Sequence, residues 1–246
     1  MKVTFICCYN NTDELNSMLL PSFNILDKNI CNIILINTYE KGYKSAAQAY
    51  NKTVKEQIDE IGDILIFCHQ DIAFDDSTFL QNIISELTKE PKQILGFAGI
   101  NGEGTVFSNL KYQESKNFIT RNQITEKKQV LSLDECCIAT SKDVYQQLLF
   151  DEYVCNHWHL YAVELCYNAN SNGIPCYIMP DIIYHKKKNN NGGLFSDKHF
   201  LKSMWRLTRK YQKKSCQIFA PCYICSTNPI KAIAKILRTC IKNIFR

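Results

Sequence analysis

Short apolar runs alternate with amphipathic segments along the first hundred residues of the chain. Continuous apolar runs bounded by polar or turn residues are typical of strands buried on both faces of a sheet. Such strands are predicted at residues 2–8, 32–36, 63–68 and 93–98. Residues 44–61 repeat apolar side chains at helical spacing from Ala47 to Ile58, and Gly62 ends this predicted helix. The alternation predicts an α/β fold, a doubly wound and mostly parallel sheet with flanking helices.

The alternation weakens after Ala98. Residues 99–128 are polar, contain several glycines and show no clean periodicity, so we expect an irregular insertion with short hairpins. Later strands are predicted at 130–133, 136–140 and 175–179, and later helices start at Ser141 and span 158–170 and 195–211. A basic, Asn- and Gly-rich loop is expected at 186–193. We therefore expect a main domain over residues 1–195 and a basic helical extension over residues 196–246.

The charge of the chain is divided unevenly. The whole chain has 29 basic and 24 acidic residues, a balance of +5. Residues 186–246 carry 15 Lys and Arg and a single acid, Asp197, which is a balance of +14 and leaves −9 for residues 1–185. An acidic body joined to a basic tail predicts an anionic partner for the tail, either a membrane surface or a nucleic acid.

The last helix of the basic tail is predicted to be amphipathic. At about 100° per residue, the apolar half of its helical wheel contains Ile230, Ile233, Ile236, Leu237, Cys240, Ile241, Ile244 and Phe245. Opposite them lie Lys231, Lys235, Arg238, Lys242 and Arg246, with no acid in the segment. The pattern favours a helix lying on an anionic membrane, and the alternative is a helix packed on the domain with its basic face in water. A nucleic-acid partner is not expected, because aromatic residues do not interleave with the basic ones.

The chain contains thirteen cysteines, a high and odd number. Many lie in apolar runs, where cysteine acts as a small hydrophobic residue, so we expect free thiols in a reducing compartment. Cys222 and Cys225 form a lone CxxC, which is a weak signal for a zinc site. No apolar run reaches about 18 residues, and the N-terminal run is too short for a signal peptide. We expect a cytoplasmic protein that the basic helix attaches peripherally to the inner face of the cell membrane.

Polar side chains able to bind metal or phosphate follow several of the predicted strands. They occur at Tyr9-Asn10, Asn37-Thr38, His69-Gln70-Asp71, Asp134-Glu135 and His185. Ligands of open α/β sheets bind beyond the carboxyl ends of the strands, so these residues are expected along one edge. A carboxylate and an imidazole there could hold a divalent metal, whereas the alternative for Asp71 is a cap of the next helix or turn. The absence of P-loop, GxGxxG and GxSxG motifs argues against kinase, Rossmann dehydrogenase and hydrolase functions.

Four segments give the chain a resemblance to a known family. They are Ser45–Asn51 (SAAQAYN), Ile66–Asp71 (IFCHQD), Leu133–Cys137 (LDECC) and Trp158–Cys166 (WHLYAVELC), followed by Gly173 and Tyr184-His185. In this order and spacing they resemble a small bacterial family 2 glycosyltransferase with the glycosyltransferase A fold. The resemblance implies transfer of a sugar from a nucleotide-sugar donor to a hydroxyl group of a glycan or lipid-linked acceptor. It also implies inversion at the anomeric carbon and a role in the synthesis of cell-surface polysaccharide or lipid-linked glycan.

The resemblance implies roles for particular residues. The nucleotide-sugar site would include Cys8, Tyr9, Asn10, Asn37, Glu40, Gln48, Asn51, His69, Gln70 and Asp134. The segment His69-Gln70-Asp71 stands where the family carries its DxD motif, so Asp71 would bind Mn²⁺ or Mg²⁺. His185 would supply a further metal or phosphate contact. The ion would neutralise the diphosphate and stabilise it as a leaving group.

Two departures from the pattern of the family leave alternatives open. His69 replaces the first Asp of DxD, and it either ligates the metal or hydrogen-bonds ribose or phosphate. The acidic base motif of the family aligns at Tyr161-Ala162, which cannot accept a proton. The candidates for the general base are therefore Glu164, Asp151 and His159, with Glu152 beside them, although Glu164 could equally be a paired helix acid. Without a base, the chain would be a non-catalytic nucleotide-sugar-binding or scaffolding subunit with the same fold.

Overall fold

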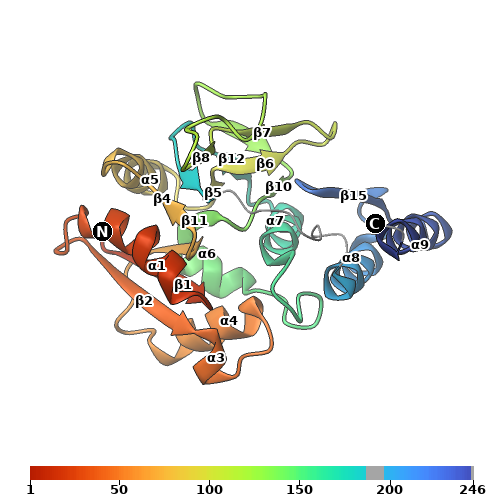
Figure 1. The fold of residues 1–246 in the computed structure, drawn as a ribbon, viewed down its shortest axis with the longest axis horizontal. Coiled ribbons are helices and arrows are strands. Elements are labelled where there is room, and N and C mark those ends of the chain that lie inside the picture. Colours follow the sequence, from red (N-terminus) through yellow and green to blue (C-terminus); the bar gives the residue numbers. More distant parts are fainter. Residues whose placement is uncertain (187–196, 245–246) are drawn as a thin grey trace.

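The computed structural model describes residues 1–186 and 197–244, and its centre is a seven-stranded sheet (Figure 1). The strand order is β2 (Cys31–Asn37), β1 (Val3–Tyr9), β3 (Ile64–His69), β11 (Cys137–Ser141), β5 (Ile94–Gly96), β12 (Cys176–Ile178) and β9 (Lys128–Val130). β1 is parallel to both β2 and β3, β5 is parallel to β12, and β11 and β9 run antiparallel to their neighbours. The mostly parallel sheet predicted from the sequence is confirmed.

Side chains of the central strands alternate between two apolar layers, one on each face of the sheet. In β3, Leu65 and Phe67 belong to one layer, and Ile64, Ile66 and Cys68 belong to the other. All five side chains are fully buried. A strand covered on both faces needs apolar residues at every position, which explains why β3 is a continuous apolar run in the sequence.

Helices cover both faces of the main sheet. The helices α1 (Thr12–Ser17), α2 (Leu19–Asn24) and α5 (Thr78–Lys89) pack on one face, and α4 (Ala46–Glu56), α6 (Lys142–Leu148), α7 (Tyr161–Ser171) and α8 (Lys198–Tyr211) pack on the other. The short helix α3 (Thr38–Lys41) follows β2 directly. Side chains of Asn11, Ser45 and Ser141 accept hydrogen bonds from the first turns of α1, α4 and α6. These N-caps fix where the three helices begin.

The insertion predicted after Ala98 contributes to two small sheets, at the top of Figure 1. One contains β10 (Ser132–Leu133), β6 (Ala98–Ile100) and β7 (Val106–Ser108), and the other contains β4 (Ile72–Ala73), β13 (Tyr184–His185) and β8 (Lys111–Tyr112). The pairing of β4 with β13 positions the candidate site, because it sets His185 opposite Ile72, the residue after Asp71. The expected irregular insertion with short strands is confirmed.

Three element boundaries differ from the sequence prediction. The apolar run at 93–98 serves two strands, because β5 ends at Gly96 and β6 begins at Ala98. The helix predicted from Trp158 begins at Tyr161, because the preceding Leu160 has a left-handed φ of 68°. A right-handed helix cannot include such a residue. The helix predicted over 44–61 is shorter, since α4 ends at Glu56.

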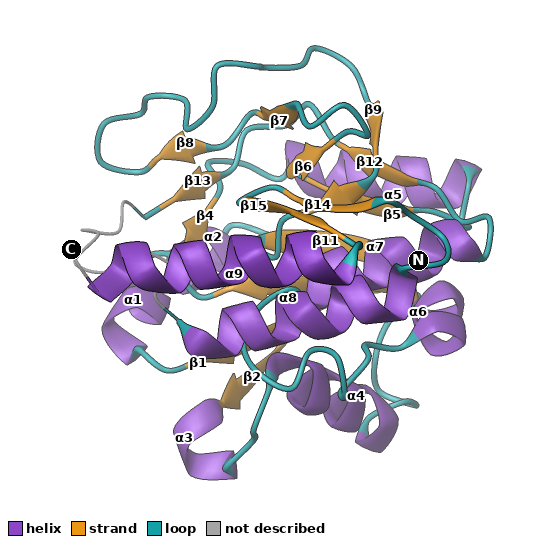
Figure 2. Ribbon diagram, turned by 90° about the vertical axis from the view of Figure 1, so that its right-hand side faces the viewer, coloured by secondary structure: helices purple, strands orange, loops and turns teal. Residues whose placement is uncertain are grey.

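The chain from residue 197 onward packs onto the same body. After α8 come a hairpin of β14 (Gln217–Ala220) and β15 (Tyr223–Ser226) and then α9 (Pro229–Ile244). Figure 2 shows α8 and α9 side by side on one flank, with α9 facing outward. Phe200, Met204 and Leu207 of α8 and Ile218 of β14 belong to the same apolar layer as α7. The hairpin was not predicted, because its strands are short and lack a marked turn sequence.

The predicted domain boundary between residues 195 and 196, and residues 187–193 of the predicted loop, lie outside the described residues, so the boundary stays a prediction. All thirteen cysteines fall within the described part of the chain and are free thiols there. Within residues 1–186 and 197–244, no helix combines the length and the apolar character needed to span a membrane.

Candidate active site

A cavity of about 470 Å³ lies beyond the carboxyl ends of β1 and β3. The lining residues that the sequence predicted as candidate ligand-binding or base residues are Cys8, Tyr9, Asn10, Thr38, His69, Gln70, Asp71, Asp134, Glu135, His159 and His185. The remaining lining residues are Ala46, Tyr50, Trp158, Tyr161, Phe200 and Cys222. This is the edge at which α/β sheets usually bind ligands, so the cavity is the candidate active site.

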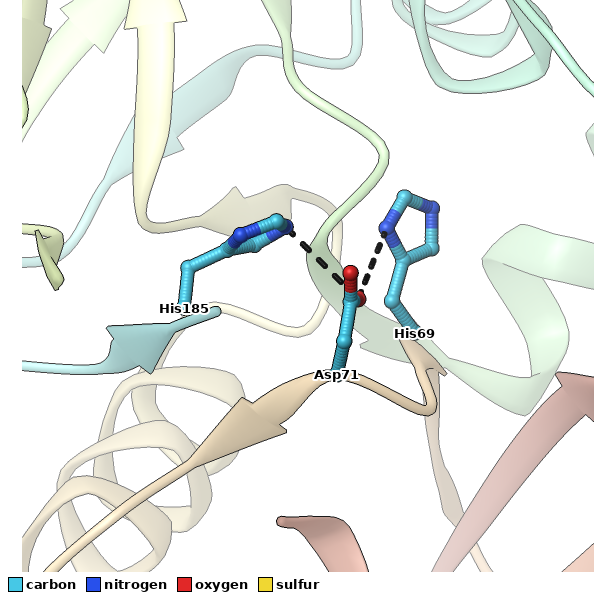
Figure 3. A group of neighbouring side chains, drawn as sticks. All are labelled: His69, Asp71 and His185. Atoms are coloured by element: carbon cyan, nitrogen blue, oxygen red, sulfur yellow. Dashed lines mark ion pairs between the residues drawn. The ribbon is translucent and has the colours of Figure 1, made fainter. Parts of the chain in front are cut away.

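Two imidazoles and one carboxylate converge in this cavity (Figure 3). Nδ1 of His69 lies 3.8 Å from Oδ1 of Asp71, and Nε2 of His185 lies 3.6 Å from the same oxygen. One ligand atom from each residue falls within 4.8 Å of the other two. Nitrogen and oxygen donors at this spacing fit a single divalent ion, and three side chains leave part of its coordination shell for phosphate oxygens.

Strand pairing brings the three residues together from distant parts of the chain. β3 ends at His69, and β4 begins directly after Asp71. β13 then pairs with β4, and the backbone N–H of Lys186 donates to the carbonyl oxygen of Asp71 at 3.0 Å. Asp71 is only 2% exposed. A carboxylate buried to this extent needs polar or charged neighbours, and the two imidazoles lie where such neighbours are required.

A backbone hydrogen bond orients the ring of His185. Its Nδ1 lies 2.9 Å from the carbonyl oxygen of Lys186. Because a carbonyl can only accept a hydrogen bond, Nδ1 carries the proton, and Nε2 presents its lone pair on the side of Asp71. Metal-binding histidines commonly donate their second ring nitrogen to a carbonyl or carboxylate in this way.

The ring of His69 is oriented by a tyrosine. Nε2 of His69 lies 3.3 Å from the hydroxyl oxygen of Tyr161, and that hydroxyl donates to the carbonyl oxygen of Glu135 at 3.4 Å. With the hydroxyl proton directed to the carbonyl, the hydroxyl oxygen can accept from Nε2–H of His69, in the tautomer that leaves Nδ1 unprotonated. The lone pair of Nδ1 then faces Asp71. Both histidines are therefore arranged as metal ligands, each through the nitrogen nearer to the carboxylate.

Gln70 ties the turn after β3 to the loop after β1. Its Oε1 accepts from the backbone N–H groups of Asn10 and Asn11 at 2.8 and 3.0 Å. Its Nε2 donates to Oδ1 of Asn10 and to a carboxylate oxygen of Glu14, at 3.0 and 2.9 Å. Both ends of the amide are thus engaged within the protein. Gln70 was predicted to bind the donor, and the structure places its polar atoms in support of the cavity wall.

Glu135 presents a second carboxylate to the cavity. Its Oε1 accepts a hydrogen bond from the backbone N–H of Leu160, which precedes α7. Burial, and then the nearby charge of Asp134, raise the pKa of Glu135 to about 8. A carboxylate with a pKa near neutrality can both take up and release a proton under ordinary conditions. This is the property that a general base or acid requires.

His159 lines the cavity and has a carboxylate partner. Its Nε2 lies 3.2 Å from Oδ2 of Asp197. Oδ1 of Asp197 accepts from the backbone N–H of His199 in the first turn of α8. Burial acts to raise the pKa of Asp197, but the hydrogen bond from His199 and the nearby His159 ring lower this pKa overall. The ionised Asp197 can hold the imidazole in one orientation, so His159 is the second group in the cavity that could accept a proton.

Four predicted donor-site residues do not line the cavity. Asn37 uses its side chain to cap α3, and Glu40 within that helix is exposed. Gln48 and Asn51 border a different cavity of about 600 Å³, lined by α4 and α6. The amide of Asn51 donates to the carbonyl oxygen of Phe150 at 2.9 Å. The side chains of Asn37, Gln48 and Asn51 accept or donate hydrogen bonds within the protein, and none of the four residues lines the cavity at the ends of β1 and β3.

Glu164 and Asp151, two predicted candidates for the general base, also lie outside the cavity lining. Glu164 is fully buried between α7 and α8, where its Oε1 accepts from Nζ of Lys210 at 2.6 Å and from the hydroxyl of Tyr211 at 2.9 Å. Oδ2 of Asp151 binds the same Lys210 at 2.7 Å. The side chain of Glu164 is fully enclosed, whereas that of Asp151 is 25% exposed, and neither carboxylate lines the cavity. The structure therefore corresponds to the alternative of a paired helix acid for Glu164.

Several aromatic residues of the cavity were not predicted from the sequence. Tyr50 and Tyr161 reach it from α4 and α7 and are almost completely buried. Trp158 and Tyr161 belong to Trp158–Cys166, one of the four segments that carry the family resemblance. Their place in that segment could have marked them as residues of the site. Phe200 and Cys222 come from the predicted C-terminal extension. No local sequence signal assigns these two to the cavity, because only the packing of α8 and the hairpin brings them there.

Comparison with protein families agrees with this geometry. The sequence profile of a family described as "Glycosyltransferase like family" matches residues 4–188. The matched region contains nearly all of the main sheet and the three residues of the candidate metal-binding cluster. The chain therefore belongs to this glycosyltransferase-like family. No curated protein sequence matches the chain.

Solved glycosyltransferase structures share the fold. GalNAc-T7 in complex with UDP, GalNAc and Mn²⁺ has a TM-score of 0.61 at 12% identity, over 86% of this chain and 48% of that one. The mannosyltransferase PcManGT from Pyrobaculum calidifontis, in complex with GDP-Man and Mn²⁺, has a TM-score of 0.59 at 11% identity, over 97% of this chain and 68% of that one. S. aureus TarS, residues 1–349, in complex with UDP-GlcNAc has a TM-score of 0.56 at 11% identity, over 85% of this chain and 66% of that one.

The chain spans about half of the GalNAc-T7 chain and about two thirds of the PcManGT chain and of the TarS chain of residues 1–349. At these identities the likeness concerns the fold. The large, mostly parallel sheet and these structural neighbours together confirm the predicted glycosyltransferase A fold.

We expect the cluster of His69, Asp71 and His185 to bind Mn²⁺ more tightly than Mg²⁺, because Mg²⁺ strongly prefers oxygen ligands to imidazole nitrogen. Isothermal titration calorimetry in the presence of a nucleoside diphosphate measures both affinities. The substitution His69→Asp replaces one nitrogen donor by a carboxylate and should reduce the preference for Mn²⁺ by about tenfold or more. His157→Asp, outside the cluster, is the matched control. Equal affinities in the wild type, or a preference that His69→Asp leaves unchanged, would contradict the assignment.

Glu135→Gln should stabilise the metal-free protein at alkaline pH. Below the unfolded-state pKa of about 4.3, the side chain is protonated in both states. Between that pH and about 8, the folded protein keeps a proton that the unfolded chain has released, so the free energy of unfolding falls as the pH rises. Glutamine removes this effect and keeps an acceptor for Leu160. An increase of only about 1 kcal/mol in the free energy of unfolding would raise the Tm near pH 8 by roughly 2–4 °C.

Thermal denaturation of both proteins near pH 4 and near pH 8 measures this difference, which should vanish at the acidic end. Glu164→Gln is the matched control, because it makes the same chemical change at a buried carboxylate that is paired with Lys210. Breaking that pair should lower the Tm. If Glu135→Gln lowers the Tm near pH 8, or raises the Tm equally near pH 4 and near pH 8, the environment assigned to Glu135 is wrong.

Proposed function

We propose that this protein is a glycosyltransferase, which moves a sugar from a nucleotide-sugar donor to a hydroxyl group of a glycan or lipid-linked acceptor. The observation that carries the proposal is the cluster of His69, Asp71 and His185 in a cavity at the ends of β1 and β3. Membership in the glycosyltransferase-like family supports it, as does a fold shared with structures that hold nucleotide sugars or Mn²⁺. We further propose that the reaction takes place in the cytoplasm and serves the synthesis of cell-surface polysaccharide or lipid-linked glycan.

The proposed donor lies across the cavity, with its nucleoside near the ends of β1 and β2. Cys8, Tyr9, Asn10 and Thr38 line this part. The diphosphate faces the cluster of His69, Asp71 and His185. The first two belong to the segment His69-Gln70-Asp71, which takes the place of a DxD motif. A divalent ion held there, Mn²⁺ or with weaker binding Mg²⁺, would neutralise the diphosphate as a leaving group. Asp134, which also lines the cavity, is proposed to contact the donor sugar.

A second cavity of about 460 Å³ adjoins the first and shares Asp134, His185 and Cys222 with it. Its wall comes mainly from the insertion and includes Leu110 and Tyr112. An aromatic and aliphatic wall suits the apolar face of a sugar ring or the start of a lipid chain. We propose that the acceptor enters through this second cavity, so that its hydroxyl meets the donor sugar at the shared residues.

In the proposed reaction, the acceptor oxygen attacks the anomeric carbon while the bond between that carbon and the diphosphate oxygen breaks. The diphosphate leaves with the bonding electrons, and the hydroxyl proton passes to a general base. Glu135 is the proposed base, because it lines the cavity beside Tyr161 and His69 and its raised pKa suits proton transfer. Attack opposite to the leaving group inverts the anomeric configuration. His159, held by Asp197, is proposed to orient the acceptor.

A second candidate function is a non-catalytic nucleotide-sugar-binding or scaffolding subunit. Ala162 favours it, because this residue stands where the family motif would carry an acid. The pairing of Glu164 and Asp151 with Lys210 also favours it, because neither carboxylate lines the cavity. Such a subunit would bind a nucleotide sugar without turning it over.

The function is tested by incubating the protein with Mn²⁺ and a panel of UDP-, GDP- and dTDP-sugars, with and without glycan and lipid-linked acceptors. At least one donor should be hydrolysed or transferred, as measured by release of nucleoside diphosphate. Asp71→Asn should lower that rate by about 100-fold, because it removes a metal ligand. Asp76→Asn, an exposed carboxylate outside the cavity, should leave it unchanged. A donor that binds without turnover would favour the non-catalytic subunit, and no binding of any donor would refute both functions.

The base is tested by kinetics of two variants. Glu135→Gln should lower kcat by about 10² to 10⁴-fold, which is the usual contribution of general base catalysis. It should leave donor affinity nearly unchanged, because the acceptor for the Leu160 N–H is retained. His159→Asn should raise the KM for the acceptor more than it lowers kcat. If His159→Asn abolishes turnover and Glu135→Gln does not, the base is His159 and the assignment to Glu135 is wrong.

A further inference from the structure

The helix α9 exposes a row of large apolar side chains that the body of the protein leaves uncovered. Its inner face, with Ala232, Ile236 and Cys240, packs on the apolar core. The exposed row consists of Ile230, Ile233, Leu237 and Ile241, which are 79%, 45%, 55% and 53% exposed. Residues three or four positions apart lie on the same side of a helix, so these four form one continuous stripe. The apolar half of the predicted wheel is therefore divided into a packed row and an exposed row.

Basic side chains lie beside the exposed row. Lys231, Lys235 and Arg238 are all exposed, and the helix Pro229–Ile244 contains no Asp or Glu. They border a groove of about 460 Å³ that runs along the helix. At about 100° per residue, the basic row and the apolar row meet on the outward side of α9, near Ala234. An ordinary solvated helix would carry polar residues there and would mix the signs of its charges.

We propose that this outward side of α9, the α9 docking face (Ile230, Ile233, Leu237 and Ile241 with Lys231 and Arg238), binds an anionic lipid surface. The apolar row would enter the boundary between headgroups and acyl chains, and the basic row would meet lipid phosphates. A second copy of the chain would instead bring two basic rows together. A nucleic acid would pair with the charges but leave the apolar row in water. Charge and apolar character together therefore select the lipid surface.

The docking face is already folded, so binding needs no coupled folding of the helix. α9 packs against α8 and β15, and Figure 2 shows it along the outer flank of the body. The hydroxyl groups of Thr239 and Tyr223 lie 3.1 Å apart, and the ring of Tyr223 lies 5.8 Å from that of Phe200, which lines the candidate active site. Tyr223 thus connects helix α9 to a residue that lines the cavity. The use of the docking face in presenting a lipid-linked acceptor rests on the proposed function, whereas docking itself does not.

Co-sedimentation of the full chain with vesicles tests the docking face. The protein should bind vesicles of phosphatidylcholine mixed with phosphatidylglycerol, and it should bind phosphatidylcholine alone much more weakly. Leu237→Glu and Ile241→Glu should each reduce binding to the anionic vesicles by at least tenfold, because each places a carboxylate in the apolar row. Ile25→Glu, a 52% exposed apolar residue on another part of the surface, is the matched control and should bind as the wild type does.

The basic row is tested separately. Lys231→Ala and Arg238→Ala should each lower the partition coefficient about fivefold at moderate ionic strength, as expected for ~1 kcal/mol per basic residue near an anionic surface. Lys55→Ala, an exposed lysine on α4, should have no effect. Circular dichroism and nucleoside diphosphate binding of each variant report whether the fold and the donor site remain intact.

Equal binding to neutral and anionic vesicles, or full binding by Leu237→Glu, would overturn the proposal. So would a wild-type dimer that Leu237→Glu converts to a monomer in sedimentation velocity, since the row would then bind a second copy. Vesicle binding requires no turnover, so these results are independent of the donor assay. If the wild-type protein transfers sugar but does not bind anionic vesicles, only the docking face is refuted. If it binds anionic vesicles but shows no transfer, only the proposed transfer is refuted.

Discussion

The burial of the Asp71 carboxylate at the turn between β3 and β4 is the constraint on which the rest of the site depends. A carboxylate that is 2% exposed is unfavourable unless polar or positively charged groups surround it. The structure meets this requirement with residues from two distant segments, His69 at the end of β3 and His185 on β13. The pairing of β13 with β4 is therefore more than a small sheet in an irregular region. It completes the candidate cation site that His69, Asp71 and His185 form within the described part of the cavity.

In the proposed assignment of His69-Gln70-Asp71 as a DxD variant, a histidine in place of the first carboxylate would change the electrostatics of the site. Two carboxylates would cancel the charge of a divalent ion, whereas one carboxylate and two neutral imidazoles leave one positive charge in excess. That excess favours the binding of a diphosphate and stabilises the charge that develops on it as a leaving group. The hydrogen bond of Nε2 of His69 to Tyr161 and that of Nδ1 of His185 to a backbone carbonyl keep the coordinating nitrogens in place. A histidine at the first position of the proposed motif is thus compatible with the proposed transfer.

The main sheet, and the place of His69 and Asp71 at its edge, could be predicted from the sequence because both depend on local patterns, whereas His185 reaches them only through the pairing of β13 with β4. Strands such as β3 are continuous apolar runs, and the polar residues that follow them must lie at one edge of a parallel sheet. Whether the side chain of Glu164 faces α8 or the cavity could not be predicted in the same way. Apolar residues surround α7 on nearly every side, so its helical pattern does not distinguish the face that meets α8 from the face that meets the cavity. Phe200 and Cys222 are brought to the cavity by packing of the C-terminal segment, which no local signal describes.

The central claim is that His69, Asp71 and His185 hold the divalent ion that binds the donor diphosphate. A crystal structure of the protein with Mn²⁺ and a nucleoside diphosphate tests it most directly, because anomalous scattering locates the ion without ambiguity. The ion should be bound by Nδ1 of His69, a carboxylate oxygen of Asp71 and Nε2 of His185, with diphosphate oxygens among its other ligands. An ion bound by Asp134 and Glu135 instead, or a diphosphate bound in the cavity with no ion at Asp71, would contradict the account.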